Sequence, residues 1–277
     1  MNPLSLVAIL AGVFSLYALV ASLVTGDTSQ VDRLWSIAPI FYVWVFFFSA
    51  HQSRSRLLIV ALLITAWGMR LTFNFARKGG YSGVEDYRWA ILRARMSKWQ
   101  FHLFNLFFIV LYQNFIIVMM GVPALMVYDH QDRKLSFADG FLAFIFVLLL
   151  IGEFIADQQQ WDFHQEKKAI VRSGQVPRVR FLQTGLFKYS RHPNYFFEIS
   201  QWWVIYVIGA HAASQVISWP IVGAVLLTLL FIGSTRFTEQ ISLGKYPEYV
   251  EYQRRTSAVI PWFSRAQADP IEATSPI

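Results

Sequence analysis

Cysteine is absent from this chain of 277 residues, and Asp, Glu, Lys and Arg together make up only 15% of it. Without cysteine, disulfide bonds, thiolate nucleophiles and thiolate metal ligands are excluded. The sequence also has no HExxH, Walker, GxGxxG or nucleophile-elbow motif. Its six histidines, at positions 51, 102, 130, 164, 192 and 211, do not recur at a ligand spacing, so we expect no bound metal.

Apolar residues make up 55% of the sequence and are gathered into long runs. A helix of about 20 apolar residues crosses the roughly 30 Å hydrocarbon layer of a bilayer. The runs predict seven transmembrane helices, at about 4–25, 35–50, 57–76, 101–127, 138–156, 194–212 and 216–235. Pro123 should bend or end the fourth of them. The sequence therefore predicts an all-α integral membrane protein.

The basic residues predict how the spans are oriented. The net charge is +7, and the Lys and Arg residues gather in 77–98, 167–191 and 245–265. By the positive-inside rule these three segments face the cytoplasm, which places the N-terminus outside and the C-terminus inside. Only Arg54 and Arg56 disagree with this topology. The charge thus indicates membrane orientation or an anionic cofactor, and we expect no nucleic-acid partner.

The first apolar run could be mistaken for a signal peptide. It has no basic segment before it and its apolar stretch is too long, so we interpret it as the first span. We expect a single membrane domain over residues 1–265. The polar residues 266–277 are expected to be disordered.

Polar residues share helix faces at the ends of two predicted spans. Ionisable groups inside a span are costly and commonly functional. The residues at helical spacing are Glu153, Asp157, Trp161 and His164 on the fifth span, and Asn194, Glu198 and Gln201 on the sixth. The alternatives are a helix that emerges into water for the first set, and a structural hydrogen bond between helices for the second.

Three further polar positions stand beside or within spans. On the third span, Arg70, Asn74 and Arg77 share a face, and Arg70 lies too deep to reach water easily. At the end of the seventh, Arg236 either forms a surface ion pair with Glu239 or binds a phosphate while Glu239 holds it. Near the second span, Asp32 is either a helix N-cap or a functional carboxyl group.

Six short segments together carry a resemblance to a known family. They are Val31–Trp35, Trp67–Thr72, Glu85–Trp89, Gly185–Glu198, Lys245–Tyr249 and Ile260–Trp262. With them the chain resembles the DUF1295 family of membrane proteins over nearly its whole length. That family is related to steroid 5α-reductases, and more distantly to sterol reductases and isoprenylcysteine carboxyl methyltransferases. The resemblance implies a seven-span fold whose C-terminal half binds a cofactor from the cytosol.

The resemblance implies an enzyme of one of two kinds. The first is an NADPH-dependent reductase that transfers hydride to an activated carbon–carbon double bond of a steroid-like, isoprenoid or fatty-acyl substrate. The second is a methyltransferase that uses S-adenosylmethionine, because the Arg191-His192-Pro193 element occurs there too. A lipid-binding or transport protein without catalysis is a third interpretation. The lipophilic substrate would enter from the bilayer of a bacterial inner membrane or an endoplasmic reticulum equivalent, among membrane lipids.

The cofactor residues implied by the resemblance lie in 137–265, the cofactor half. Asn194 and Glu198 match an Asn and a Glu that reductases place at the nicotinamide carboxamide, and Arg236 matches a phosphate-binding Arg. The full set is Asp157, His164, Arg172, Tyr189, Arg191, His192, Asn194, Tyr195, Glu198, Arg236, Glu239, Tyr246 and Tyr249.

Residues 1–136 would form the substrate-side half. Here the chain departs from steroid 5α-reductases, since Trp67 aligns with their carbonyl-polarising Tyr and an indole cannot act as an acid. Our first candidate for the acid, or for the group that orients the substrate carbonyl, is therefore Asp32, because a desolvated carboxyl group stays protonated near neutral pH. Tyr87 is the second candidate, with Arg70 as electrostatic support. The oligomeric state stays open.

Overall fold

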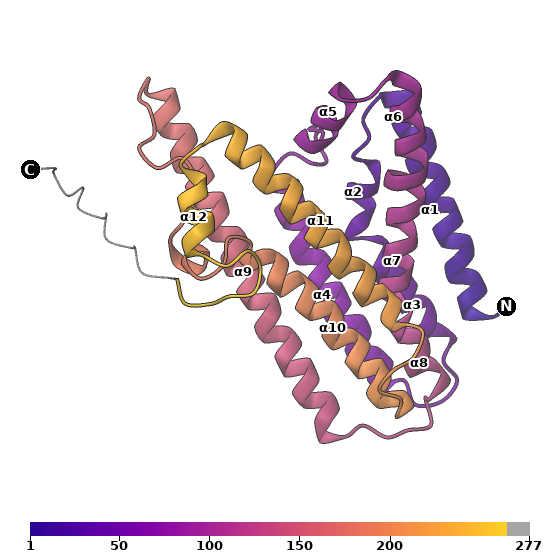
Figure 1. The fold of residues 1–277 in the computed structure, drawn as a ribbon. Helices are drawn as coiled ribbons and strands as arrows, with labels where there is room; N and C mark the ends of the chain where they lie inside the picture. The colour runs from indigo at the N-terminus through magenta and orange to yellow at the C-terminus, as the bar shows by residue number, and fades with distance from the viewer. Residues whose placement is uncertain (265–277) are drawn as a thin grey trace, which may run out of the picture. The chain divides into compact units, whose positions relative to one another are not determined.

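The computed structural model describes residues 1–264 of the chain (Figure 1). These residues form helices joined by loops, with one isolated backbone bridge between Ser190 and Ser257, so the all-α class is confirmed. The predicted tail, 266–277, lies outside the described residues. The α-helices are α1 (Pro3–Thr25), α2 (Gln30–Trp35), α3 (Ala38–Ser49), α4 (Ser55–Arg77), α5 (Tyr87–Ala94), α6 (Lys98–Phe104), α7 (Gln113–Gly121), α8 (Pro123–Asp129), α9 (Phe137–Arg172), α10 (Pro193–Ala213), α11 (Ile221–Lys245) and α12 (Tyr249–Arg255). Two further helices are the π-helix η1 (Asn105–Tyr112) and the 3₁₀-helix η2 (Gly185–Lys188).

Within the described residues, six helical segments are long and apolar enough to cross a membrane. They are Pro3–Thr25, Gln30–Ser49, Ser55–Arg77, Lys98–Asp129, Phe137–Arg172 and Ile221–Lys245. They coincide with six of the predicted spans, so the chain is a multi-pass membrane protein. The remaining predicted span, 194–212, is the 21-residue helix α10, whose polar residues lower its hydropathy. Its passage through the membrane stays a prediction, and so does the orientation of the termini.

The fourth predicted span is interrupted, as the sequence indicated. Helix α7 ends at Gly121, and α8 begins at Pro123. Proline has no N–H to donate within a helix but fits the first helical position, so it starts a new helix instead of continuing the old one. The π-helix η1, which lies between α6 and α7, was not predicted, because the apolar run has the same composition throughout.

The chain packs as two compact units. The first unit comprises Met1–Leu150 and Ile199–Leu229, and the second comprises Ile151–Glu198 and the chain from Leu230 onward. Helices α9, α10 and α11 contribute one end to each unit, so the division differs from the predicted halves. In the first unit, Gly209 and Gly223 lie where an added Cβ would be 2.8 Å and 2.2 Å from backbone carbonyl oxygens of Pro123 and Met119. Such close approach requires glycine.

Helix α3 is central to the first unit and packs against α1, α4, α7 and α8 (Figure 1). Its Tyr42 and Phe46 are fully buried, and so is Trp67 of α4. The Trp67 ring meets the Trp202 ring edge-on, with the ring centroids 4.8 Å apart. Burial of such large side chains on neighbouring helices holds this unit together. In this unit Trp67 is a core residue.

Arg56, which seemed to oppose the predicted topology, is a buried residue with a carboxylate partner. Its Nε and Nη2 atoms donate to the two oxygens of Asp139 at 2.7 Å and 2.9 Å. Nη2 also donates to the carbonyl oxygen of Lys134 at 2.8 Å. The ion pair explains how a buried guanidinium is accommodated here. Arg56 still counts against the predicted orientation, which stays a prediction.

The absence of cysteine allows the predicted topology to be tested with single cysteines. We expect a membrane-impermeant maleimide to label Gln215→Cys, between α10 and α11, from outside intact cells. It should label Gln175→Cys, in the loop after α9, only after permeabilisation, because α10 would separate the two positions. The cysteine-free parent protein gives the background. Labelling of both positions from the same side would show that α10 does not cross the membrane.

Candidate functional site

All thirteen residues predicted to bind a cofactor lie in the second unit. They come from the last part of α9, the loop before α10, the first two turns of α10, the end of α11 and the segment that includes the start of α12. These stretches are far apart in the sequence but form one packing unit. The three catalytic candidates, Asp32, Arg70 and Tyr87, lie in the first unit.

Helix α9 carries three of the candidates beyond its apolar part. With 36 residues it is longer than a membrane requires, so its end extends about two or more turns beyond the hydrocarbon layer. Asp157 is buried, whereas His164 and Arg172 are exposed. Glu153, one turn before Asp157, is also buried. The polar face predicted for this helix therefore includes buried carboxyl groups as well as exposed residues.

Arg191 and Glu239 form a two-point ion pair at the centre of the second unit. Arg191 Nε and Nη2 donate to the Glu239 carboxylate oxygens at 2.6 Å and 3.0 Å. Arg191 Nη1 donates to the carbonyl oxygens of Gln253, at 3.0 Å, and Thr256. The pair therefore connects the loop before α10, helix α11 and the segment around α12, and it fixes where α10 starts.

The Glu239 carboxylate accepts from two more side chains. The Nε2 atom of His192 lies 3.2 Å from Oε1, and Gln253 Nε2 donates to Oε2 at 2.7 Å. We call Arg191, His192, Glu239 and Gln253 the Glu239 cluster. The suggestion that Glu239 holds Arg236 is wrong, because both carboxylate oxygens face the cluster. The geometry gives Arg191, His192 and Glu239 a positioning role within the protein.

The chain after α12 is tied to the loop before α10. Arg191 and His192 donate their backbone N–H groups to Ser257 and Ala258 at 2.9 Å and 3.0 Å. The fully buried Ser190 donates its hydroxyl to the Val259 carbonyl at 2.7 Å. Sequence reasoning missed the role of Ser190, although it lies inside the segment that carried the resemblance. Trp262 also donates its backbone N–H to the Tyr189 carbonyl oxygen at 2.9 Å, so the matched segments Gly185–Glu198 and Ile260–Trp262 belong to one local structure.

Asn194, Tyr195 and Glu198 lie on the first two turns of α10. Tyr195 stacks on the His192 ring at 5.0 Å and meets Phe231 edge-on at 4.7 Å. Glu198 is buried, and Asn194 is half-buried. Within the described chain, no hydrogen bond is recorded for the Asn194 amide. This end of α10 therefore carries an amide at Asn194 and a carboxyl group at Glu198, one turn apart.

The predicted tyrosines divide into exposed and buried ones. Tyr189 is 40% exposed, whereas Tyr249 is 5% exposed and lies edge-on to Phe181 at 5.0 Å. Burial, together with the nearby Glu239 carboxylate, raises the pKa of Tyr249. The Tyr246 hydroxyl accepts from Lys167 Nζ at 2.9 Å. Tyr246 and Tyr249 therefore belong to an aromatic cluster beside α9 and α12, whereas the Tyr189 ring is exposed to solvent.

In the first unit, Asp32 lies in the first turn of α2. Ser29 is the N-cap residue of this helix, so the alternative that Asp32 is an N-cap is wrong. Asp32 Oδ2 accepts a hydrogen bond from Trp89 Nε1 at 2.9 Å. Tyr87 starts α5 and is 49% exposed. Arg70 is buried in α4.

The predicted polar face of α4 is present. Arg77 Nε and Nη2 donate to Asn74 Oδ1 at 3.0 Å and 2.8 Å, one turn apart on the helix. Asn74 and Arg70 are both buried. Polar residues on the buried face of an apolar helix are costly, so they usually pair with other polar groups or serve a function.

Two matched segments of the N-terminal half meet in the first unit. Glu85 accepts from the backbone N and the hydroxyl of Thr28 at 2.9 Å and 2.7 Å, and it pairs with Arg93 at 2.6 Å. Burial opposes ionisation of Glu85, but the hydrogen bonds from Arg93 and Thr28 outweigh it and lower its pKa. Together with the Asp32–Trp89 bond, these contacts hold the α5 segment against α2.

Within the described residues, no group of three or more His, Asp or Glu side chains is placed to hold a metal ion.

Comparison with known proteins gives a family match over most of the chain. The model of the DUF1295 family, described as proteins of unknown function, matches residues 18–256. The uncharacterized protein C594.04c of Schizosaccharomyces pombe is 37% identical over 252 residues, which cover 86% of this chain and 73% of that protein. No solved structure matches the chain.

Proposed function

The chain belongs to the DUF1295 family, and on that premise we propose that it is an NADPH-dependent reductase of a lipophilic substrate in the membrane. The observation that carries the proposal is the collection of all thirteen cofactor candidates in the second unit. These residues come from four helices and two loops and belong to one packing unit. The resemblance of their motifs to those of steroid 5α-reductases supports a dinucleotide as the cofactor.

The donor groups of the second unit suit a dinucleotide. Arg236 is exposed at the end of α11, where a guanidinium is suited to a phosphate. Asn194 and Glu198, at the start of α10, carry the donor and acceptor groups that a carboxamide requires. The bound cofactor would supply the hydride, and the protein would supply its placement.

The first unit would supply the proton. Reduction of an activated double bond adds a hydride to one carbon and a proton to the other. We assign the proton to the Asp32 carboxyl group, which the Trp89 indole orients through its 2.9 Å hydrogen bond. Tyr87 is the second candidate, and Arg70 would stabilise negative charge on an activating carbonyl oxygen. Substrates of this chemistry include steroid-like, isoprenoid and fatty-acyl molecules, which reach the protein through the bilayer.

A binding titration tests the cofactor. We expect the purified protein to bind NADPH saturably, followed by nicotinamide fluorescence. Asn194→Ala should raise the dissociation constant about tenfold or more, since a lost hydrogen bond to a buried polar group costs about 1–3 kcal/mol. Gln175→Ala removes an amide from an exposed loop of the same unit and should change it less than about twofold.

The same titration separates the reductase from its rivals. Saturable binding of S-adenosylmethionine without any effect of NADPH would replace the proposal by a methyltransferase. Absence of both cofactors, with Asn194→Ala and Glu198→Gln behaving as the parent protein, would favour a lipid-binding or transport protein.

A further inference from the structure

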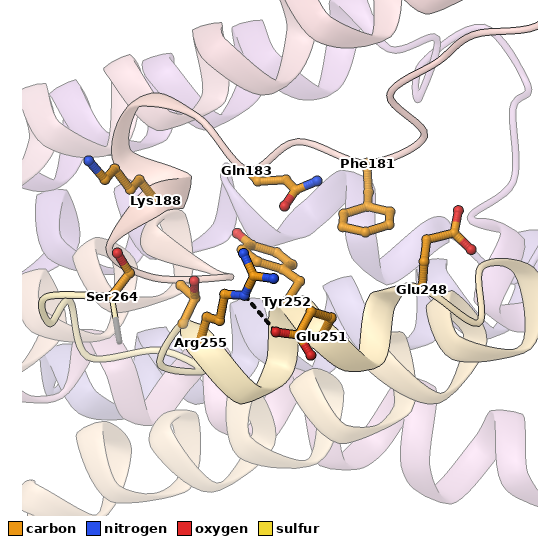
Figure 2. Close-up of a pocket in the computed structure, with 9 residues that line it drawn as sticks. Phe181, Gln183, Lys188, Glu248, Glu251, Tyr252, Arg255 and Ser264 are labelled. Carbon is orange, nitrogen blue, oxygen red and sulfur yellow. Dashed lines mark hydrogen bonds and ion pairs between the residues drawn. The ribbon is translucent and has the colours of Figure 1, made fainter. Parts of the chain in front are cut away.

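A pocket of about 350 Å³ lies in the second unit and contains none of the predicted cofactor residues (Figure 2). One side comes from the stretch that leads into η2, and the other from α12 and the residues beside it. The lining residues are Phe181, Gln183, Lys188, Glu248, Glu251, Tyr252, Arg255, Thr256 and Ser264. Phe181 and Tyr252 stack with their ring centroids 5.6 Å apart and form an apolar wall. The remaining lining side chains are polar or charged.

The charges around the pocket leave an excess of positive charge. Each lining carboxylate has a cationic partner: Glu251 pairs with Arg255 at 2.6 Å and Arg254 at 3.7 Å, and Glu248 pairs with Arg180 at 3.6 Å. Among the lining residues, Lys188 and Arg255 balance Glu248 and Glu251. Because Arg180 pairs with Glu248 from outside the lining, one positive charge is left in excess. Such a pocket favours an anionic ligand over a cationic one.

Arg255 is held in a way that suits an oxyanion. Its Nε donates to Glu251, and this bond leaves the two Nη groups at the free end of the guanidinium. Figure 2 shows that end directed toward Gln183, whereas the Lys188 side chain lies apart from it, on the same side as Ser264. A guanidinium fixed through Nε presents a planar pair of donors, which matches two oxygens of one phosphate.

We propose that this pocket binds a phosphate group, which Arg255 and Lys188 hold. The amide of Gln183 and the hydroxyl groups of Thr256 and Ser264 add uncharged donors to the two cations. Two sources of phosphate are at hand for this protein, the proposed cofactor and the headgroups of anionic lipids. The first source rests on the proposed function, and the second does not.

The nucleotide arm compares NADPH with NADH, which lacks one phosphate, on the purified full chain. If the cofactor supplies the phosphate, Lys188→Gln and Arg255→Gln should each weaken NADPH binding about ten- to hundredfold. If the phosphate that NADH lacks is the one that occupies the pocket, the same two variants should weaken NADH binding less than NADPH binding. Arg254→Gln is the control: it removes the same charge from the next residue, whose side chain is 75% exposed and does not line the pocket.

The lipid arm uses nanodiscs of equal parts phosphatidylglycerol and phosphatidylcholine. If a headgroup supplies the phosphate, the parent protein and Arg254→Gln should retain phosphatidylglycerol in native mass spectra. Lys188→Gln and Arg255→Gln should lose it. Because Arg255 also holds Glu251, circular dichroism checks its fold, and Lys188→Gln decides alone if Arg255→Gln does not fold.

The two arms also separate this proposal from the proposed function. If neither ligand responds to Lys188→Gln or Arg255→Gln, the phosphate pocket is refuted, while NADPH binding to the parent protein would leave the reductase intact. If the parent protein binds no NADPH, the reductase is refuted, and the lipid arm alone decides about the pocket.

Discussion

Replacing Glu239 by alanine is expected to destabilise the second unit by about 3–5 kcal/mol, the typical cost of removing one partner of a buried ion pair. Glu239 is 8% exposed, and its carboxylate accepts from Arg191, His192 and Gln253. Alanine would leave the Arg191 guanidinium without its counter-charge. Unfolding in detergent, followed by tryptophan fluorescence and circular dichroism, measures the loss.

Glu251→Ala is the matched control, because it removes the same side chain from an ion pair at the surface. Its pair with Arg255 is partly exposed and should contribute less than about 1 kcal/mol. A second comparison replaces both partners, as Arg191→Met with Glu239→Leu. This double variant should be more stable than Glu239→Ala, since no charge is left alone in the interior. Equal stability of Glu239→Ala and Glu251→Ala would contradict the role of the cluster.

The Glu239 cluster explains why the Arg191-His192-Pro193 element cannot identify a cofactor. The side-chain N–H groups of Arg191 and His192 donate to Glu239, and Arg191 also donates to backbone carbonyl groups. Pro193 then begins α10 directly after them. The element therefore fixes the start of a helix. A reductase and a methyltransferase could both contain such a helix, so the element does not distinguish them. Under the proposed function, the choice between the two cofactors would therefore depend on other residues, such as Asn194.

The helices could be predicted from the sequence because the length of an apolar run is a direct consequence of bilayer thickness. α10 is the informative case. Its length suits a span, but Asn194, Glu198 and Gln201 lower the apolar content of its first half. The division into two units was not predictable, because its boundaries fall inside α9, α10 and α11, where helical periodicity continues unchanged.

The site was predictable where neighbours share one helix and not elsewhere. Spacing placed Asn74 and Arg77 together, and the structure pairs them. Spacing also suggested that Glu239 pairs with Arg236, three residues earlier on the same helix. The carboxylate is instead bound by Arg191, which is 48 residues away in sequence. Periodicity reports contacts along one helix, whereas loops decide contacts between segments. Lys188 and Arg255 were missed for the same reason, since they end two short helices with no pattern of their own.

Asp32→Asn is expected to lower kcat about 10²- to 10⁴-fold while the dissociation constant of NADPH stays within about twofold. An amide fills the space of the carboxyl group and can still accept the hydrogen bond from Trp89, but it cannot donate a proton as an acid. NADPH binding should persist, because Asp32 lies in the first unit and all the cofactor candidates lie in the second. Loss of NADPH absorbance with membrane lipid extract as substrate measures kcat.

Three further variants locate the proton donor. Asp27→Asn is the matched control, because Asp27 precedes the same helix and its carboxylate pairs with Arg33 at 2.5 Å; it should retain kcat. Trp89→Phe removes the hydrogen bond that orients Asp32 but keeps the carboxyl group and an aromatic ring, so it should lower kcat less than Asp32→Asn does. If Asp32→Asn retains kcat and Tyr87→Phe abolishes it, the exposed Tyr87 phenol is the donor. If both retain kcat, the proton comes from neither residue, and both assignments are refuted.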